Sequence, residues 1–141
     1  MQIFLLSMFL FYGKNSNVQQ EHDIDRIEFT TLTRGYHKNV TITIHAVKIS
    51  EQLKGDDKEI MTQKEINSNQ WEQFINALRD VSLTEISSLK SPTMKRAFDG
   101  ARASTITITN TKGETFSHAF DNENPNEKLE PLMRLLIELQ K

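Results

Sequence analysis

Two stretches of alternating side chains, each interrupted by a tight turn, constrain the fold of this chain most strongly. The clearer one lies in the second half of the chain, where residues 103–109 alternate around Ile106 and Ile108. Residues 110–113 (Asn-Thr-Lys-Gly) have the composition of a turn, and alternation resumes in residues 115–120 with Phe116, His118 and Phe120 on one face. A period of two on both sides of such a turn predicts an antiparallel hairpin with one buried face.

A first hairpin is predicted nearer the N-terminus. Residues 27–34 alternate and are rich in β-branched side chains, and residues 34–38 are predicted to form the turn. Residues 39–47 are predicted to return as one strand, with one face made of Val40, Ile42, Ile44 and Ala46. A second turn is predicted at 54–57, and residues 58–64 are a candidate for a short third strand.

Helices are predicted after each hairpin. The first carries an apolar stripe at i, i+3, i+4 and i+7, made of Trp71, Phe74, Ile75 and Leu78, and residues 67–69 are its capping candidates. A short helical piece is predicted after Ser82 and should end before Pro92. The last helix carries Leu129, Leu132, Met133, Leu136 and Leu139, with Pro131 tolerated in its first turn.

The order of these elements, ββ(β)α-ββα, predicts an α+β fold. We expect an antiparallel sheet of four to five strands with the helices packed on one face. Doubly wound folds are disfavoured, because tight turns rather than helical crossovers join the strands. The 141 residues predict one such domain, covering residues 26–141.

The N-terminus differs sharply from this domain. Of the first 12 residues, 10 are hydrophobic and none is charged, which predicts a signal-like apolar leader at 1–12. The run is too short for an ordinary membrane-spanning helix. The alternative is a buried N-terminal strand or helix. Residues 13–25 are polar and acidic and are predicted to form a tether.

The junction at residues 10–15 (Leu-Phe-Tyr-Gly-Lys-Asn) resembles the end of a bacterial lipoprotein signal peptide, with Tyr12 at the position of the lipid-bearing cysteine. Tyrosine has no thiol to acylate. Through residues 92–101 and the order of its elements, the rest of the chain is similar to uncharacterised small exported bacterial proteins. This resemblance implies an exported protein of the periplasm or cell envelope and brings no known activity. A cytoplasmic location is the alternative.

Charge and cysteine content exclude several functions. The net charge of −2 gives no overall electrostatic reason to bind nucleic acid, and a membrane contact is predicted only through a retained leader. The chain has no cysteine, which excludes thiol catalysis and thiolate metal sites within it. No nucleophile elbow, phosphate-binding loop, dinucleotide fingerprint or zinc-protease motif is present, so neither a cofactor nor a metal is predicted.

The strongest local feature is the segment of residues 90–102. Arg96 and Arg102 are candidates for receiving a carboxylate or a phosphate, because guanidinium donors match such anions. Alternatively, Asp99 pairs with Arg96 at i+3 and simply orders the turn. Met94 and Phe98 are predicted to pin this segment to the core.

The predicted first turn adds Arg34, Tyr36 and His37, which place an aromatic ring and cations at a hairpin tip. Tyrosine and arginine are preferred anchors at protein interfaces, although a solvated turn is the alternative. The partner-binding candidates are therefore Arg34, Tyr36, His37, Arg96, Asp99 and Arg102. Among the histidines, His118 lies between two phenylalanines on its own face, so it is either an acid/base candidate or a core-margin histidine.

These observations predict a small exported, non-enzymatic domain that binds a protein partner or a small ligand through its hairpin tip and mid-chain loop. An inhibitor or immunity-type protein that acts by surface complementarity is one alternative. A hydrolase or lyase that uses His118 with Asp99 or Asp121 is another.

Overall fold

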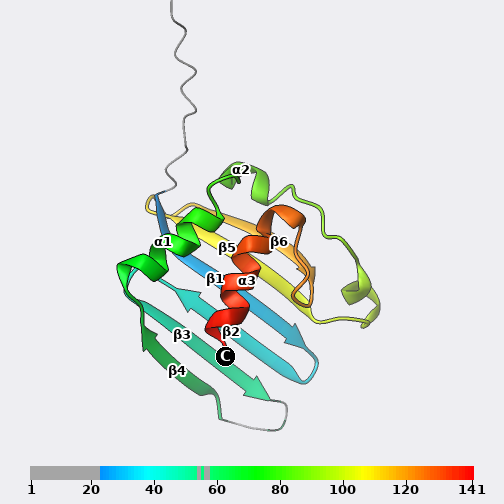
Figure 1. The fold of residues 1–141 in the computed structure, drawn as a ribbon. Helices are drawn as coiled ribbons and strands as arrows, with labels where there is room; N and C mark the ends of the chain where they lie inside the picture. The colour runs from blue at the N-terminus through cyan, green and yellow to red at the C-terminus, as the bar shows by residue number, and fades with distance from the viewer. Residues whose placement is uncertain (1–22, 54, 56–57) are drawn as a thin grey trace, which may run out of the picture.

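Six strands form one antiparallel sheet in the order β4-β3-β2-β1-β5-β6 (Figure 1). In this computed structural model, residues 23–53, 55 and 58–141 are described. The predicted leader, most of the predicted tether and most of the predicted turn at 54–57 lie outside these residues. The strands are β1 (Ile24–Thr33), β2 (Tyr36–Ile42), β3 (Ala46–Leu53), β4 (Ile60–Glu65), β5 (Ala103–Asn110) and β6 (Thr115–Asp121).

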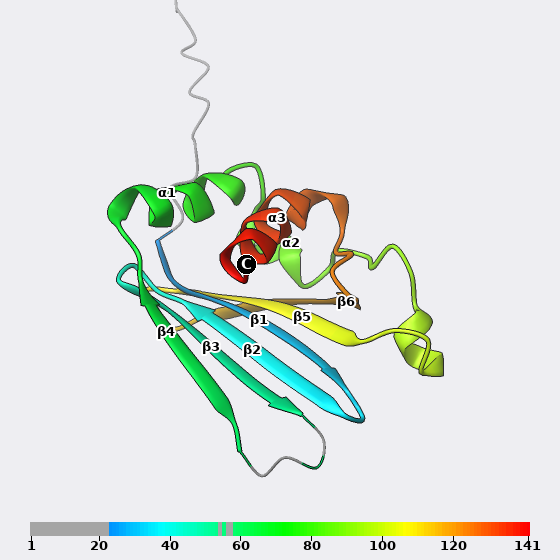
Figure 2. The ribbon, with the colours of Figure 1, turned by 60° about the horizontal axis from the view of Figure 1, so that its bottom comes forward.

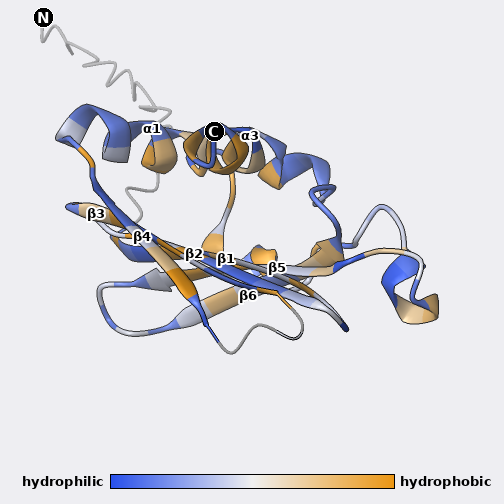
Figure 3. Cartoon of the chain, turned by 90° about the horizontal axis from the view of Figure 1, so that it is seen from below, coloured by the Kyte–Doolittle hydropathy of each residue, from blue (hydrophilic) through white to orange (hydrophobic). Residues whose placement is uncertain are grey.

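The α-helices lie on one face of this sheet, as Figures 2 and 3 show. They are α1 (Ser68–Ala77), α2 (Leu83–Ile86) and α3 (Glu130–Leu139), and two short 3-10 helices, η1 (Lys95–Phe98) and η2 (Glu127–Leu129), complete the set. The predicted α+β class with helices on one face is confirmed, with six strands instead of four to five. None of the helices among the described residues is long and apolar enough to cross a membrane.

The core lies between the sheet and the helices. β1 is central and pairs with β2 on one side and with β5 on the other, so that Ile27 lies beside Ile42 and Ile108. Because strand side chains alternate between the two faces of the sheet, these three side chains lie on the same face, where they are fully buried. Helices α1 and α3 cover them with the apolar stripes that the sequence predicts, made of Trp71, Phe74, Leu132, Met133 and Leu136.

The predicted strand at 39–47 is wrong, because a turn divides it into β2 and β3. The Thr43 N–H donates to the Ala46 carbonyl at 2.9 Å, and Ile42 faces Val47 across the turn. Ile44, predicted on the buried face, lies in the turn and is half exposed. The turn contains no glycine or proline, and apolar residues continue through it, so that periodicity alone reads it as one strand.

The predicted start of the domain at residue 26 is also corrected. β1 begins at Ile24, whose side chain belongs to the core, and the Thr111 N–H donates to the Asp23 carbonyl at 2.9 Å. A single buried isoleucine in a polar, acidic stretch carries too weak a pattern to mark a strand.

The predicted turn at 34–38 is too long, because β2 begins at Tyr36 and only Arg34 and Gly35 separate it from β1. The predicted starts of α1 and α3 and the β5–β6 turn are confirmed. Asn67 caps α1 in a reciprocal capping box with Gln70, and Pro131 lies at the start of α3. Between β5 and β6, Gly113 adopts a left-handed conformation with φ of 82°, which glycine reaches without a steric penalty. The candidate third strand is confirmed as β4.

The helices do not cover the whole face that they share with the sheet. Toward the β1–β2 turn, the helix-facing side continues beyond the C-terminal end of α3 and carries Thr33, Tyr36 and Lys38. Beside it, the segment between α2 and β5 extends from the end of the sheet (Figure 2). The fold thus places the hairpin tip and the mid-chain segment at the same end of the molecule.

Candidate functional site

The candidate site is built around residues 90–102, here called the arm, which connect α2 to β5 and contain η1. In Figure 3 the arm stands away from the helix layer, beyond the end of the sheet. Asp99 ends η1 in a left-handed conformation with φ of 56°, and the Gly100 N–H donates to the Lys95 carbonyl at 2.9 Å. Aspartate is one of the few non-glycine residues that adopt this conformation readily.

A buried ion pair attaches the arm to the sheet. Arg96 Nη1 lies 2.7 Å from Asp121 Oδ1 at the end of β6, and the Asp121 side chain is only 2% exposed. The same Nη1 also donates to Ser91 Oγ and to the Thr93 carbonyl, both at 3.2 Å. One guanidinium therefore closes the arm on itself and fixes it to the sheet.

Asp121 accepts further hydrogen bonds from the arm. Thr93 Oγ1 donates at 2.6 Å, and the backbone N–H groups of Lys95 and Arg96 donate at 2.7 and 3.2 Å. Burial alone would raise the pKa of the Asp121 carboxyl, but these hydrogen bonds and Arg96 outweigh it and hold the pKa well below its usual value. The charged carboxylate is thus the form that holds the arm.

This arrangement corrects the predicted pairing of Asp99 with Arg96. Arg96 pairs with Asp121, and Asp99 pairs instead with Arg34 of the β1–β2 turn, Nη2 to Oδ2 at 3.0 Å. The two segments singled out in the sequence, 65 residues apart, therefore meet in space. Between them lies a surface hollow of about 750 Å³, here called the tip hollow, whose lining includes Leu32, Arg34, Arg96, Asp99 and Arg102.

The prediction that Met94 and Phe98 pin the arm to the core is wrong. Phe98 is 87% exposed and Met94 is more than half exposed. Because Arg96 and Asp121 already hold the arm, its apolar side chains are left free to face outward. The local sequence does not show that an ion pair holds the arm in place of apolar side chains, because Asp121 lies 25 residues after Arg96.

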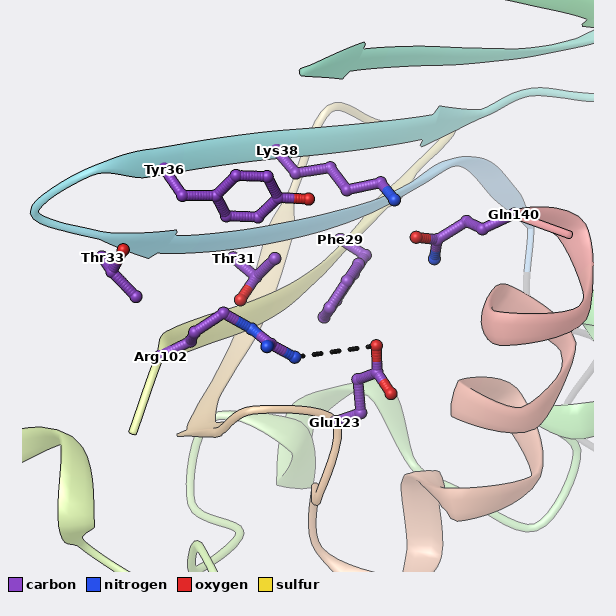
Figure 4. A pocket seen from close by; sticks show the side chains of 8 residues that line it. All are labelled: Phe29, Thr31, Thr33, Tyr36, Lys38, Arg102, Glu123 and Gln140. Atoms are coloured by element: carbon purple, nitrogen blue, oxygen red, sulfur yellow. Dashed lines mark ion pairs between the residues drawn. The ribbon is translucent and has the colours of Figure 1, made fainter. Parts of the chain in front are cut away.

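Tyr36 and Arg102 line a second, neighbouring hollow of about 490 Å³, here called the sheet cleft (Figure 4). Two charged residues of its lining, Lys38 and Glu123, were not predicted as site residues. Lys38 follows Tyr36 at i+2 and thus shares its face of β2, whereas Glu123 reaches the cleft from the segment after β6 and lies 3.8 Å from Arg102. Alternation could have identified Lys38, but no local pattern points to Glu123.

The Tyr36 hydroxyl is committed within this cleft. It donates to Glu51 Oε1 at 2.7 Å, and burial together with this hydrogen bond raises the pKa of Tyr36 to about 12. The phenol therefore stays neutral near pH 7. His37, predicted beside it as a contact residue, is exposed on the opposite face of the sheet, because neighbouring strand residues alternate.

His118 lies in the core beside Phe120, with ring centroids 5.3 Å apart. Its Nε2 accepts from the Asn126 N–H at 3.0 Å, and the ring also hydrogen-bonds to the backbone of Leu89. The two acids considered as its partners are engaged elsewhere, Asp99 with Arg34 and Asp121 with the arm. These contacts match the core-margin alternative for His118.

The burial of His118 predicts a pH-dependent stability. Burial lowers the pKa of the ring below 6.5, and Arg96 adds to this effect, while the Leu89 hydrogen bond opposes it. The unfolded chain binds the proton first as the pH falls, so that stability should decrease from about pH 7.5 to about pH 5.5. Asp121 remains ionised across this interval because its pKa lies below 3.8.

Urea unfolding midpoints at the two pH values measure this effect. His118→Gln should flatten the difference between them, whereas the exposed His37→Gln should leave it unchanged. An equal pH dependence in wild type and His118→Gln would contradict the assignment.

Among the residues that the structure describes, no three or more His, Asp or Glu side chains gather as a metal site. The site is thus a surface of two adjoining hollows lined by cations and an aromatic ring, and the exposed Phe98 precedes Asp99 of the lining in the chain. Searches of protein-family models, curated proteins and solved structures found no match to this chain.

Proposed function

We propose that this domain is a non-enzymatic binding protein that docks on a protein partner through the arm and the β1–β2 turn. Phe98 carries the proposal: a large aromatic side chain, 87% exposed, stands on a segment that a buried ion pair holds in place. Aromatic anchors dominate the binding energy of many protein interfaces. An anchor that is already held in position loses less conformational entropy on binding than one on a mobile loop.

The surroundings of Phe98 suit a protein interface. Met94 and Leu32 are exposed apolar side chains on the arm and on β1. Asp99 follows Phe98 directly in the chain, and the Arg34–Asp99 ion pair, exposed at 86% and 74%, supplies the charged part of this surface. An apolar centre with a polar, charged margin is the usual composition of such interfaces. The expected partner therefore presents an apolar pocket for one aromatic ring.

Site-specific photocrosslinking in the native cells tests the proposal. The photoreactive residue p-benzoylphenylalanine replaces Phe98 in one variant and Lys112, in the exposed β5–β6 turn, in the control. We expect one discrete adduct from position 98, absent from position 112 and lost when Leu32→Asp is added. The same set of adducts from both positions, or none from position 98, would overturn the proposal.

The stoichiometry of the adduct addresses the inhibitor or immunity-type alternative. An inhibitor of this kind acts on one enzyme or toxin, so that the adduct would contain a single protein whose activity falls on binding. A partner without an activity to inhibit would favour a plain docking domain. Nothing in the contacts of His118 favours the hydrolase or lyase alternative, because its ring contacts backbone groups.

We also propose that the domain is exported, and this part of the proposal rests on the apolar run and polarity step of residues 1–17. Intact mass of the protein from periplasmic, membrane and cytoplasmic fractions tests it. Loss of the leader with recovery from the periplasm is the expected result. A full-length mass in the cytoplasm would refute export and leave the docking proposal standing.

A further inference from the structure

The sheet cleft has features that the docking proposal does not use. It lies on the helix-facing side of β1 and β2, beside the end of α3, whereas Phe98 is an exposed residue of the arm. Its volume of about 490 Å³ falls in the range of small-molecule sites. Thus the cleft is large enough for a ligand of its own.

The cleft has an apolar floor and wall. Phe29 is buried at its base and stacks against Phe120, with ring centroids 6.3 Å apart. The Tyr36 ring lies along one side, and its hydroxyl is already bonded to Glu51 (Figure 4). A ligand therefore meets hydrocarbon at these two positions, and its body should be apolar.

Two cations line the cleft from different sides, Lys38 from β2 and Arg102 from the start of β5. Lys38 extends into the cleft from β2, and no carboxylate among the described residues forms an ion pair with its ammonium. Arg102 lies opposite, and its Nε is buried without a hydrogen-bond partner. A buried donor without a partner is uncommon in folded proteins. A ligand carboxylate would supply an acceptor to the Lys38 ammonium and to the exposed part of the Arg102 guanidinium.

Glu123 limits the charge of the ligand. It contacts Arg102 at 3.8 Å, which is longer than a hydrogen bond, so it leaves most of the guanidinium open. Glu51, which accepts from Tyr36 and lies opposite Lys38 across β2 and β3, adds a second carboxylate, so that the two cations and two carboxylates around the cleft balance. A ligand with a single carboxylate adds the smallest excess of negative charge. A dianion or a phosphate would add repulsion from Glu123.

We propose that the sheet cleft binds a small monocarboxylate with an apolar body. Lys38 and Arg102 hold the carboxylate, and Phe29 and Tyr36 contact the body. Gln140, at the end of α3, faces the same space and closes its far side.

Titration of the ¹⁵N-labelled protein with phenylacetate, and separately with its neutral analogue phenylacetamide, tests the proposal by NMR. We expect saturable shifts of the backbone amides in residues 29–38 and at Arg102 with phenylacetate. The amide analogue should bind at least about tenfold more weakly, because it lacks the charge-assisted hydrogen bonds. Equal affinity for both compounds, shifts confined to other surfaces, or no saturable shift would overturn the proposal.

Charge-removing variants test the two cations. Lys38→Met and Arg102→Gln keep most of the side-chain length, and each should lower the affinity for phenylacetate at least about tenfold. Lys48→Met is the matched control, since Lys48 is exposed on the opposite face of the sheet. Wild-type affinity in both cleft variants would refute the role of the cations, and the same spectra show whether each variant is folded.

A Phe98→Ala variant separates the cleft from the docking surface. It should bind phenylacetate as the wild type does, whether or not it retains the protein partner. Loss of phenylacetate binding in this variant would show that the arm, not the cleft, supplies the site.

Discussion

Replacing Arg96 with alanine is expected to lower the midpoint of thermal unfolding by about 10 °C. The variant leaves the buried Asp121 carboxylate without its charged partner and removes three hydrogen bonds from one guanidinium nitrogen. Truncation of one partner is the damaging change in a buried pair, because the remaining charge stays buried without compensation. The arm should lose its fixed position at the same time.

Arg34→Ala is the matched control for this result. It removes an arginine that binds the same arm through Asp99, but in an exposed pair. Exposed pairs contribute little to stability, so the midpoint should change by about 2 °C or less. Differential scanning calorimetry gives both midpoints, and hydrogen exchange of the Lys95 and Arg96 amides reports the arm. Equal midpoints for the two variants would contradict the assignment of Arg96 as the anchor.

Phe98→Ala is expected to lower the affinity for the protein partner that crosslinking isolates by about 30-fold or more. An aromatic side chain at the centre of an interface fills a pocket, and its truncation leaves that pocket empty. Because Phe98 is 87% exposed in the free protein, the same change should leave the free energy of unfolding within about 0.5 kcal/mol of the wild type. A large loss of affinity with unchanged stability identifies a contact residue.

Met61→Ala controls for removal of exposed apolar surface in general. Met61 is 68% exposed on β4, the strand at the opposite edge of the sheet from β6, to which the arm is attached. Its truncation should leave the affinity unchanged, as measured by surface plasmon resonance with the isolated partner. Equal losses in the two variants would point to non-specific apolar contact, and equal retention would remove Phe98 from the interface.

The fold class is predictable from this sequence because its determinants are local. The β5–β6 hairpin shows alternation and a glycine turn within 19 residues, and α1 shows a stripe and a capping box within 12. The β2–β3 turn escapes prediction for the converse reason. Its residues Thr43–His45 carry no breaker, and Ile44 and Ala46 continue the even-numbered alternation of β2 in the sequence. The structure instead buries the odd-numbered Val47 after the turn.

The candidate site was only partly predictable, because pairing over long sequence separations decides which arginine is free. Arg34, Arg96 and Arg102 are alike as sequence symbols. The fold assigns Arg96 to a buried anchor, Arg34 to an exposed ion pair and Arg102 to a cleft. Asp121 binds Arg96 and thereby leaves Asp99 to Arg34, and it was considered only as a partner for His118. Phe98 became exposed because an ion pair took over the anchoring expected of it.

The central position of β1 has a consequence for the order in which the chain assembles. β1 to β4 follow one another in sequence and pair as neighbours, so this half of the sheet can form from local contacts as the chain emerges. The other edge of β1 pairs with β5, about 80 residues later, and Phe29 meets Ile106 there. Until β5 is made, an apolar strand edge stays open to pairing with other chains. The N-terminal half is therefore the part of the chain expected to aggregate most readily before the C-terminal hairpin and α3 complete the sheet.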